Sequence, residues 1–232
     1  MYIFPQISTN RKIAIYLFLL AIVLGPYLTL AFFCHPLPGD DFTFALRTLQ
    51  LGSHGDVVYE AYVKWTGRYF LCWVLTWRSI FYNTIFGYQL CIFILILAFP
   101  VLIHFLVKFI FKTIDLGHHI LLVLIITFLY LYNLPSQSQG IFWFTGSIAY
   151  QFPNLMMGVY VIILYLITSS RSKAAISLYL LIGSVQIIMV SGCNEISMGI
   201  LFVFNVLCTG YQFYNKSDKR YVFLFLISIS LM

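Results

Sequence analysis

Charged residues are scarce in this sequence. Only 9% of its 232 residues are Asp, Glu, Lys or Arg, whereas 62% are hydrophobic. Soluble domains average about 25% charged and about 45–50% apolar residues, so this composition excludes a soluble fold. A helix needs about 20 apolar residues to cross a bilayer, and the chain holds several such runs. We therefore predict an all-α, multi-pass integral membrane protein.

Two motif classes are also missing. The cysteines show neither Cys-x-x-Cys spacing nor clustering with His, so neither a metal site nor a disulfide framework is supported; they are Cys34, Cys72, Cys91, Cys193 and Cys208. There is no Gly-rich phosphate loop of the P-loop or Rossmann type, so a cytoplasmic nucleotide donor is not supported. The net charge of +6 comes from Lys and Arg in the short breaks between apolar runs, which indicates membrane topology and no nucleic-acid partner.

The apolar runs predict a helical bundle of about six or seven spans. They cover residues 13–33, 85–107, 119–134, 153–169, 174–191 and 197–214, with an incomplete span from 221. The first run is too long for a signal-peptide core, so we expect a retained span. The last is too short to cross, so we expect that the chain breaks off inside a helix and lacks a C-terminal part. Residues 1–232 then form one transmembrane domain, with a long external loop at 34–84.

Basic residues set the predicted orientation. With the N-terminus in the cytoplasm, the inner face carries Arg11, Lys12, Lys108, Lys112, Arg171, Lys173, Lys216, Lys219 and Arg220, and the outer face carries Arg47, Lys64, Arg68 and Arg78. Treating the apolar segment 69–83 as a span would reverse this positive-inside bias, so we place it along the outer interface. Most acidic residues then face outward: Asp40, Asp41, Asp56, Glu60 and Glu195. We predict a multi-pass protein of the inner (cytoplasmic) membrane whose chemistry lies on the external face. In a bacterium this face would be the periplasm or cell exterior, and in a eukaryote it would be the organelle lumen.

The external loop begins with an adjacent pair of carboxylates. Asp40 and Asp41 precede a helical apolar pattern, and one of them could cap that helix, which leaves the other without a structural role. A second amphipathic helix starts at Asp56, with the Glu60/Lys64 pair on its polar face. It runs into Trp65-Thr66-Gly67-Arg68, where Arg68 could bind a phosphate or act as an interface anchor.

Two further external segments carry polar candidates. Residues 139–154 contain Trp143 and Tyr150, which an aromatic belt would explain, and Thr145 and Asn154, which could hydrogen-bond to a sugar. The turn at Asn194-Glu195 places an acid at the membrane boundary, where an ionisable group needs a partner. The most economical partner for Glu195 is Arg68 or Arg78.

These motifs together resemble membrane glycosyltransferases of the GT-C fold class. The resemblance rests on a Pro-Gly-Asp-Asp-aromatic motif at 38–42, a Trp-x-Gly-Arg motif at 65–68, and an aromatic-Thr-Gly-x-x-x-Tyr motif at 144–150, with Asn194-Glu195 as a fourth element. It covers essentially the whole chain and is most similar to bacterial multi-pass members. The C-terminal extramembrane domain that many such enzymes carry is absent from this sequence.

The resemblance implies transfer of a sugar from a polyprenyl-phosphate carrier to a cell-envelope glycan, lipid or protein outside the cytoplasm. Asp40 or Asp41 would be the catalytic base, and the pair could hold a divalent cation. Substrate contacts would come from Trp65, Arg68, Trp143, Thr145, Tyr150, Asn154, Asn194 and Glu195. Arg68 would stabilise the departing phosphate.

Three other functions stay open at this point. A flippase or transporter for lipid-linked oligosaccharides would place ionisable groups within its spans, and only His104 is clearly inside one. A polysaccharide polymerase would also work on the external face. A purely structural subunit would leave Asp40, Asp41 and Glu195 without a role.

Overall fold

The computed structural model describes residues 9–36, 39–51, 53–76, 85–214 and 220–231. Within these ranges the chain is helical, with no β-strand. The long helices are α1 (Thr9–Phe33), α6 (Ile85–Ile110), α7 (Leu116–Tyr132), α9 (Phe152–Ser169), α10 (Lys173–Ser191) and α11 (Glu195–Tyr214), and the 11-residue α12 (Arg220–Ser230) packs on α10 and α11. The short ones are α2 (Asp40–Leu51), α3 (His54–Ala61), α4 (Tyr69–Thr76), α8 (Phe144–Gly146) and the π-helical turns η1 (Tyr62–Thr66), η2 (Ser138–Phe142) and η3 (Ser147–Gln151).

The apolar helices confirm the prediction of an all-α membrane protein. Among the described residues, four helical stretches are long and apolar enough to cross a membrane: Ala14–Phe33, Ile85–Ile110, Phe144–Ser169 and Lys173–Ser191. Leu116–Tyr132 and Glu195–Tyr211 are shorter apolar helices, and they coincide with the predicted runs at 119–134 and 197–214.

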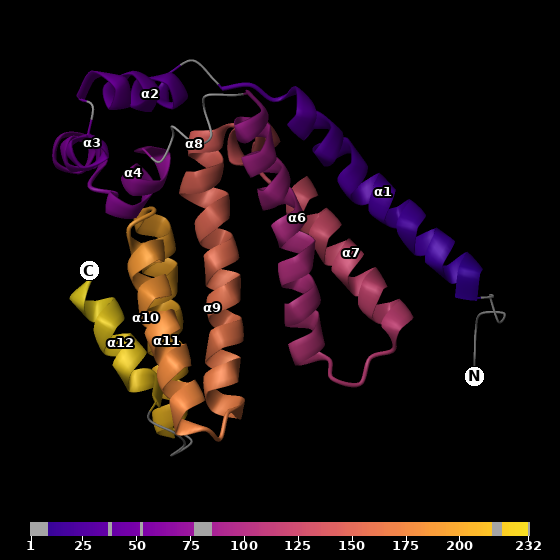
Figure 1. The fold of residues 1–232 in the computed structure, drawn as a ribbon. Helices are drawn as coiled ribbons and strands as arrows, with labels where there is room; N and C mark the ends of the chain where they lie inside the picture. The colour runs from indigo at the N-terminus through magenta and orange to yellow at the C-terminus, as the bar shows by residue number, and fades with distance from the viewer. Residues whose placement is uncertain (1–8, 37–38, 52, 77–84, 215–219, 232) are drawn as a thin grey trace.

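The long helices alternate in direction, and the short ones gather at one end of the bundle. Figure 1 shows α2, α3, α4 and α8 at the end where α1 finishes and α6 begins. The same end holds the turn between α10 and α11 (Figure 1). The eight-residue α4 lies within the segment 69–83, and Figure 1 shows it between α3 and α8, above α10. α4 thus lies with the other short helices at one end of the bundle, and its position along the membrane interface stays a prediction.

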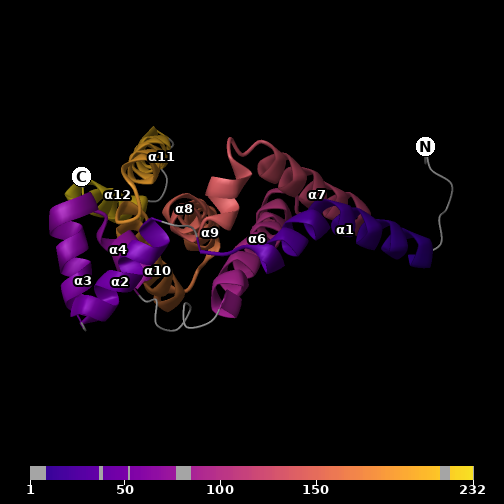
Figure 2. The same ribbon diagram turned by 90° about the horizontal axis from the view of Figure 1, so that it is seen from above.

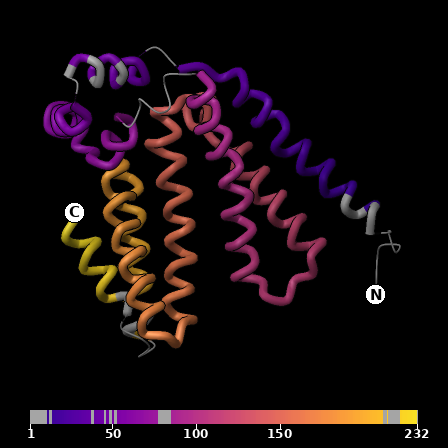
Figure 3. The backbone as a smooth tube through the Cα atoms, viewed as in Figure 1, coloured from indigo at the N-terminus to yellow at the C-terminus, as the bar shows by residue number. Residues whose placement is uncertain are grey.

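The bundle has two helical units joined near its middle. The tube in Figure 3 shows α1, α6 and α7 on one side and α9 to α12 on the other. The first unit shares its buried core with the short helices, through residues such as Ala31, Leu71 and Tyr88. The second has a separate core that includes Tyr160, Ile187 and Leu224. Phe99 and Leu102 of α6 pack with Leu155 of α9 and connect the two units.

Side-chain caps fix several helix starts. Asp115 accepts hydrogen bonds from the backbone N–H of Gly117 at 3.1 Å and of His118 at 3.5 Å, and so satisfies two donors that the first turn of α7 leaves unpaired. Ser172 accepts from Ala175 N at 3.4 Å and caps α10 in the same way. These polar caps separate the apolar runs into helices.

Some predicted features lie outside the described residues. They are Pro38 of the first motif, Arg78 with the rest of 77–83, and the basic residues Lys216 and Lys219.

Candidate functional site

A cavity of about 200 Å³ lies where the short helices meet. One side is formed by α2, η1 and α4, and the other by the segment from Trp143 to Tyr150. Figure 2 shows α2, α3 and α4 beside α8 and the end of α9 when the bundle is seen from above. The lining residues are Asp40, Phe44, Trp65, Thr66, Arg68, Leu71, Cys72, Leu75, Trp143, Thr145, Gly146, Ala149 and Tyr150.

Six residues that the sequence marked as functional line this cavity. They are Asp40, Trp65, Arg68, Trp143, Thr145 and Tyr150. They come from three motifs that are separated by up to about a hundred residues in the chain, and folding brings them to one place. The cavity thus combines a carboxylate, a guanidinium and aromatic rings.

The two aspartates have different surroundings. Asp41 is only 1% exposed, and its Oδ1 accepts hydrogen bonds from Thr145 Oγ1 at 2.6 Å and Thr145 N at 3.2 Å. Its Oδ2 lies 3.5 Å from the Tyr88 hydroxyl, which also donates to Phe142 O at 2.8 Å. Asp40, one residue earlier, is partly exposed and lines the cavity. Asp41 therefore anchors α2 to α8, a contact between helices that the helix-capping prediction did not include.

Close backbone approach shapes the wall opposite Asp40. A Cβ atom at Gly146 would lie 2.2 Å from the Gln139 carbonyl oxygen and 2.7 Å from the Trp143 ring. Only glycine fits at this contact between η2 and α8. On the other wall, Gly67 has φ +65°, a conformation that glycine adopts without strain, and this residue turns the chain from η1 toward Arg68.

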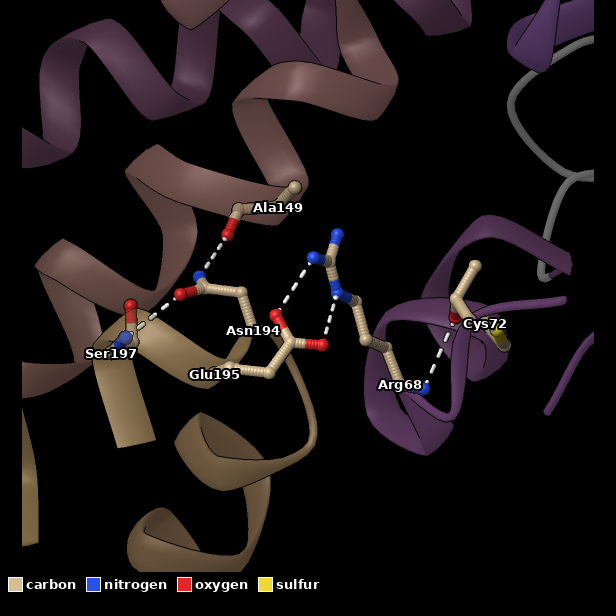
Figure 4. A network of polar contacts seen from close by, with 7 residues as sticks. Arg68, Cys72, Ala149, Asn194, Glu195 and Ser197 are labelled. Carbon is tan, nitrogen blue, oxygen red and sulfur yellow. Dashed lines mark hydrogen bonds and ion pairs between the residues drawn. The ribbon is translucent and has the colours of Figure 1, made fainter. Parts of the chain in front are cut away.

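Arg68 and Glu195 form a two-point ion pair. Arg68 Nε donates to Glu195 Oε1 at 3.1 Å, and Nη2 donates to Oε2 at 2.7 Å. Figure 4 shows the guanidinium reaching from the η1–α4 link to the turn before α11. This contact confirms one of the two partners predicted for Glu195. The hydrogen bond to Glu195 raises the pKa of Arg68, to which the nearby Tyr150 adds, so the guanidinium is always charged.

Asn194 has a structural position next to this ion pair. It is 2% exposed, its Nδ2 donates to Ala149 O at 2.5 Å, and its Oδ1 accepts from Ser197 N at 2.7 Å (Figure 4). It therefore caps α11 and ties this helix to η3. Asn194 and Glu195 do not line the cavity itself.

Asn154 lies in a different polar cluster. Its Nδ2 donates to the Tyr130 hydroxyl at 3.1 Å, and that hydroxyl donates to Gln151 Oε1. The structure does not bring Asn154 to the cavity that the other predicted residues line. The sequence did not predict this separation, because the π-helical turn η3 lies between Thr145 and Asn154 and turns Asn154 away from the cavity.

The aspartate pair fits a divalent cation poorly. Asp41 Oδ1 already accepts two hydrogen bonds from Thr145. Across the described ranges, no three His, Cys, Asp or Glu side chains come together as a metal-ligand group. Hard cations take several oxygen ligands, so the aspartate pair does not supply a complete ligand set for one.

The apolar lining of the cavity was not predicted. Phe44, Leu71, Leu75 and Ala149 have no chemical signature in the sequence. Cys72 is buried there, and burial raises the pKa of its thiol, which disfavours the thiolate. His104, the ionisable residue predicted inside a span, lies with its Nδ1 3.0 Å from Nε2 of His119 on α7.

No protein-family model, curated protein or solved structure matches this chain.

Proposed function

We propose that this protein is a membrane glycosyltransferase that takes its sugar from a polyprenyl-phosphate carrier. The observation that carries the proposal is the cavity in which the carboxylate of Asp40 and the guanidinium of Arg68 are brought together with Trp65, Trp143 and Tyr150. Aromatic rings suit the apolar faces of sugars, and a guanidinium suits a phosphate. The motif resemblance to GT-C enzymes supports the same assignment.

The reaction needs one proton acceptor and one stabiliser of negative charge. The hydroxyl oxygen of the acceptor attacks the anomeric carbon and gives its proton to the Asp40 carboxylate. The bond between the anomeric carbon and the phosphate oxygen breaks, and its electron pair goes to that oxygen. Arg68 stabilises the charge that develops on the departing polyprenyl phosphate. Asp41 positions Asp40 through its hydrogen bonds to Thr145.

The site's place in the fold suits a lipid-linked donor. It lies at the end of the bundle that holds the short helices α2 to α4, on which large apolar residues such as Phe42, Tyr59 and Val63 are exposed. Exposed apolar and aromatic groups of this kind favour the membrane interface. We propose a bacterial cytoplasmic membrane, a cytoplasmic N-terminus and an external cavity. The acceptor would then be a cell-envelope glycan, lipid or protein.

A transfer assay tests the proposal. The full chain and its Asp40→Asn and Asp41→Asn variants are reconstituted in lipid, and we measure the movement of radiolabelled sugar from polyprenyl-phosphate donors to a cell-envelope extract. We expect D40N to lose transfer by about a hundredfold or more, the scale for removal of a general base. Glu60→Gln is the matched control, because Glu60 pairs with Arg47 and Lys64 and does not line the cavity.

Two results would overturn the proposal. One is a D40N variant that transfers sugar as fast as wild type. The other is a wild-type protein that consumes no donor. Movement of the intact donor across the bilayer without its consumption would favour the flippase alternative.

A further inference from the structure

We infer that Glu195 is a positioning residue that holds Arg68 so that its remaining amino group meets the phosphate of the donor. This inference rests on the proposed function and adds to it a named atom, Nη1 of Arg68. Glu195 does not line the cavity, so it acts only through Arg68.

The ion pair divides the guanidinium into two edges. Nε and Nη2 both donate to Glu195, at 3.1 Å and 2.7 Å, and Nη1 takes no part in that pair. Because the guanidinium is planar, two bonds along one edge fix the direction of the other. Arg68 also lines the cavity, where Tyr150 is a further side-chain hydrogen-bond partner, so a phosphate in the cavity would meet the edge that carries Nη1 beside the Tyr150 side chain.

The turn that carries Glu195 is hydrogen-bonded to both walls of the site. Asn194 donates to Ala149 O of η3, and the Gly192 carbonyl accepts from Phe70 N and Leu71 N of α4, each at 3.0 Å. Tyr69 adds a bond from its hydroxyl to Ile188 O at 2.5 Å. The turn between α10 and α11 is thus a fixed platform between α4 and η3. A carboxylate on this platform defines where the guanidinium sits.

Stability alone does not account for Glu195. Its side chain is 63% exposed, and exposed ion pairs contribute little to folding. The backbone and Asn194 bonds already join the same elements without it. The removal of Glu195 should therefore leave the fold intact and let the Arg68 side chain rotate. The phosphate oxygen that receives the electron pair of the broken sugar bond would then lose an oriented donor.

The test compares Glu195→Gln, Glu195→Asp, Arg68→Lys and the E195Q/R68K double variant, with E60Q as control. We measure kcat, KM for the donor, affinity for the product polyprenyl phosphate, and thermal unfolding in lipid. We expect E195Q to lower kcat by about 10- to 100-fold with unchanged unfolding, the scale for residues that orient a reacting group. E195D, which keeps the charge, should recover part of this loss. The double variant should transfer no more slowly than R68K, because both changes remove one function.

The outcomes separate this inference from the proposed function. If D40N abolishes transfer while E195Q matches wild type, the inference is wrong and the glycosyltransferase proposal stands. An additive double variant, or a loss that follows unfolding alone, would likewise refute the positioning role. If wild type transfers nothing but binds polyprenyl phosphate, and E195Q weakens that binding, the positioning role stands and the transfer proposal falls. If neither protein binds it, both are wrong.

Discussion

Replacing Thr145 by Val should destabilise the protein through the loss of one hydrogen bond. Valine has nearly the shape of threonine but lacks the hydroxyl that donates to Asp41 Oδ1 at 2.6 Å. Both residues are buried, with exposed fractions of 1% for Asp41 and 7% for Thr145. A hydrogen bond to a carboxylate contributes about 1.5–3 kcal/mol, and a buried acceptor that loses it has no water to replace it. We expect the free energy of unfolding to fall by about 2–3 kcal/mol.

The measurement is reversible unfolding in lipid–detergent micelles, with Thr127→Val as the matched control. Thr127 is also buried, but its hydroxyl donates at 2.7 Å to Val123 O within its own helix, a carbonyl that helical bonding already serves. T127V should cost less than about 1 kcal/mol. In the Asp41→Asn background, where the acceptor is neutral, T145V should cost only about 0.5–1.5 kcal/mol. Equal losses for T145V and T127V, or no difference between the two backgrounds, would refute this account of Asp41.

Three further predictions use other residues of the bundle. Gly146→Ala should unfold at a markedly lower temperature and lose transfer, since its Cβ would lie 2.2 Å from a backbone oxygen, whereas Gly199→Ala, with open space, should not. Thr209→Val should be neutral or stabilising in the same unfolding assay, because the buried Thr209 Oγ1 has no hydrogen-bond partner among the described residues. The hydrogen bond from Arg68 lowers the pKa of Glu195 below its ordinary value of 4.5. The ion pair therefore stabilises the fold at pH values above 4.5. That small contribution should disappear as the pH falls through the lowered pKa, and a melting-temperature profile of E195Q should lack this component.

The bundle was largely predictable because lipid-crossing helices have a strong signature in the sequence. The apolar runs at 85–107 and 174–191 match α6 and α10, since some 20 apolar residues in sequence fit few other structures. The π-helical turns were not predictable. In η2 and η3 the chain makes tight contacts around Gly146 that depend on tertiary packing, whereas the sequence pattern suggested only an external aromatic segment.

Several polar residues of the candidate site could be predicted from the sequence, but their arrangement in space could not. Asp40 and Arg68 stand out because charge is scarce in this chain, and the Glu195 partner followed from the cost of an unpaired acid near lipid. The different surroundings of Asp40 and Asp41 could not be predicted from their adjacent positions. They depend on Thr145, which lies 104 residues away from Asp41 in the chain.

The long sequence separation of Arg68 and Glu195 has a consequence for biogenesis. The two residues are 127 positions apart, and ribosomes extend a chain by about 5–20 residues per second. Roughly 6–25 s of synthesis therefore pass between the appearance of the arginine and that of its carboxylate partner. During this interval α1 and α6 can already insert into the membrane. The backbone N–H groups of Phe70 and Leu71 in α4 still lack their acceptor, the Gly192 carbonyl, which has not yet been synthesised. The end of the molecule that holds the cavity is thus assembled late, after most of its membrane helices have left the ribosome.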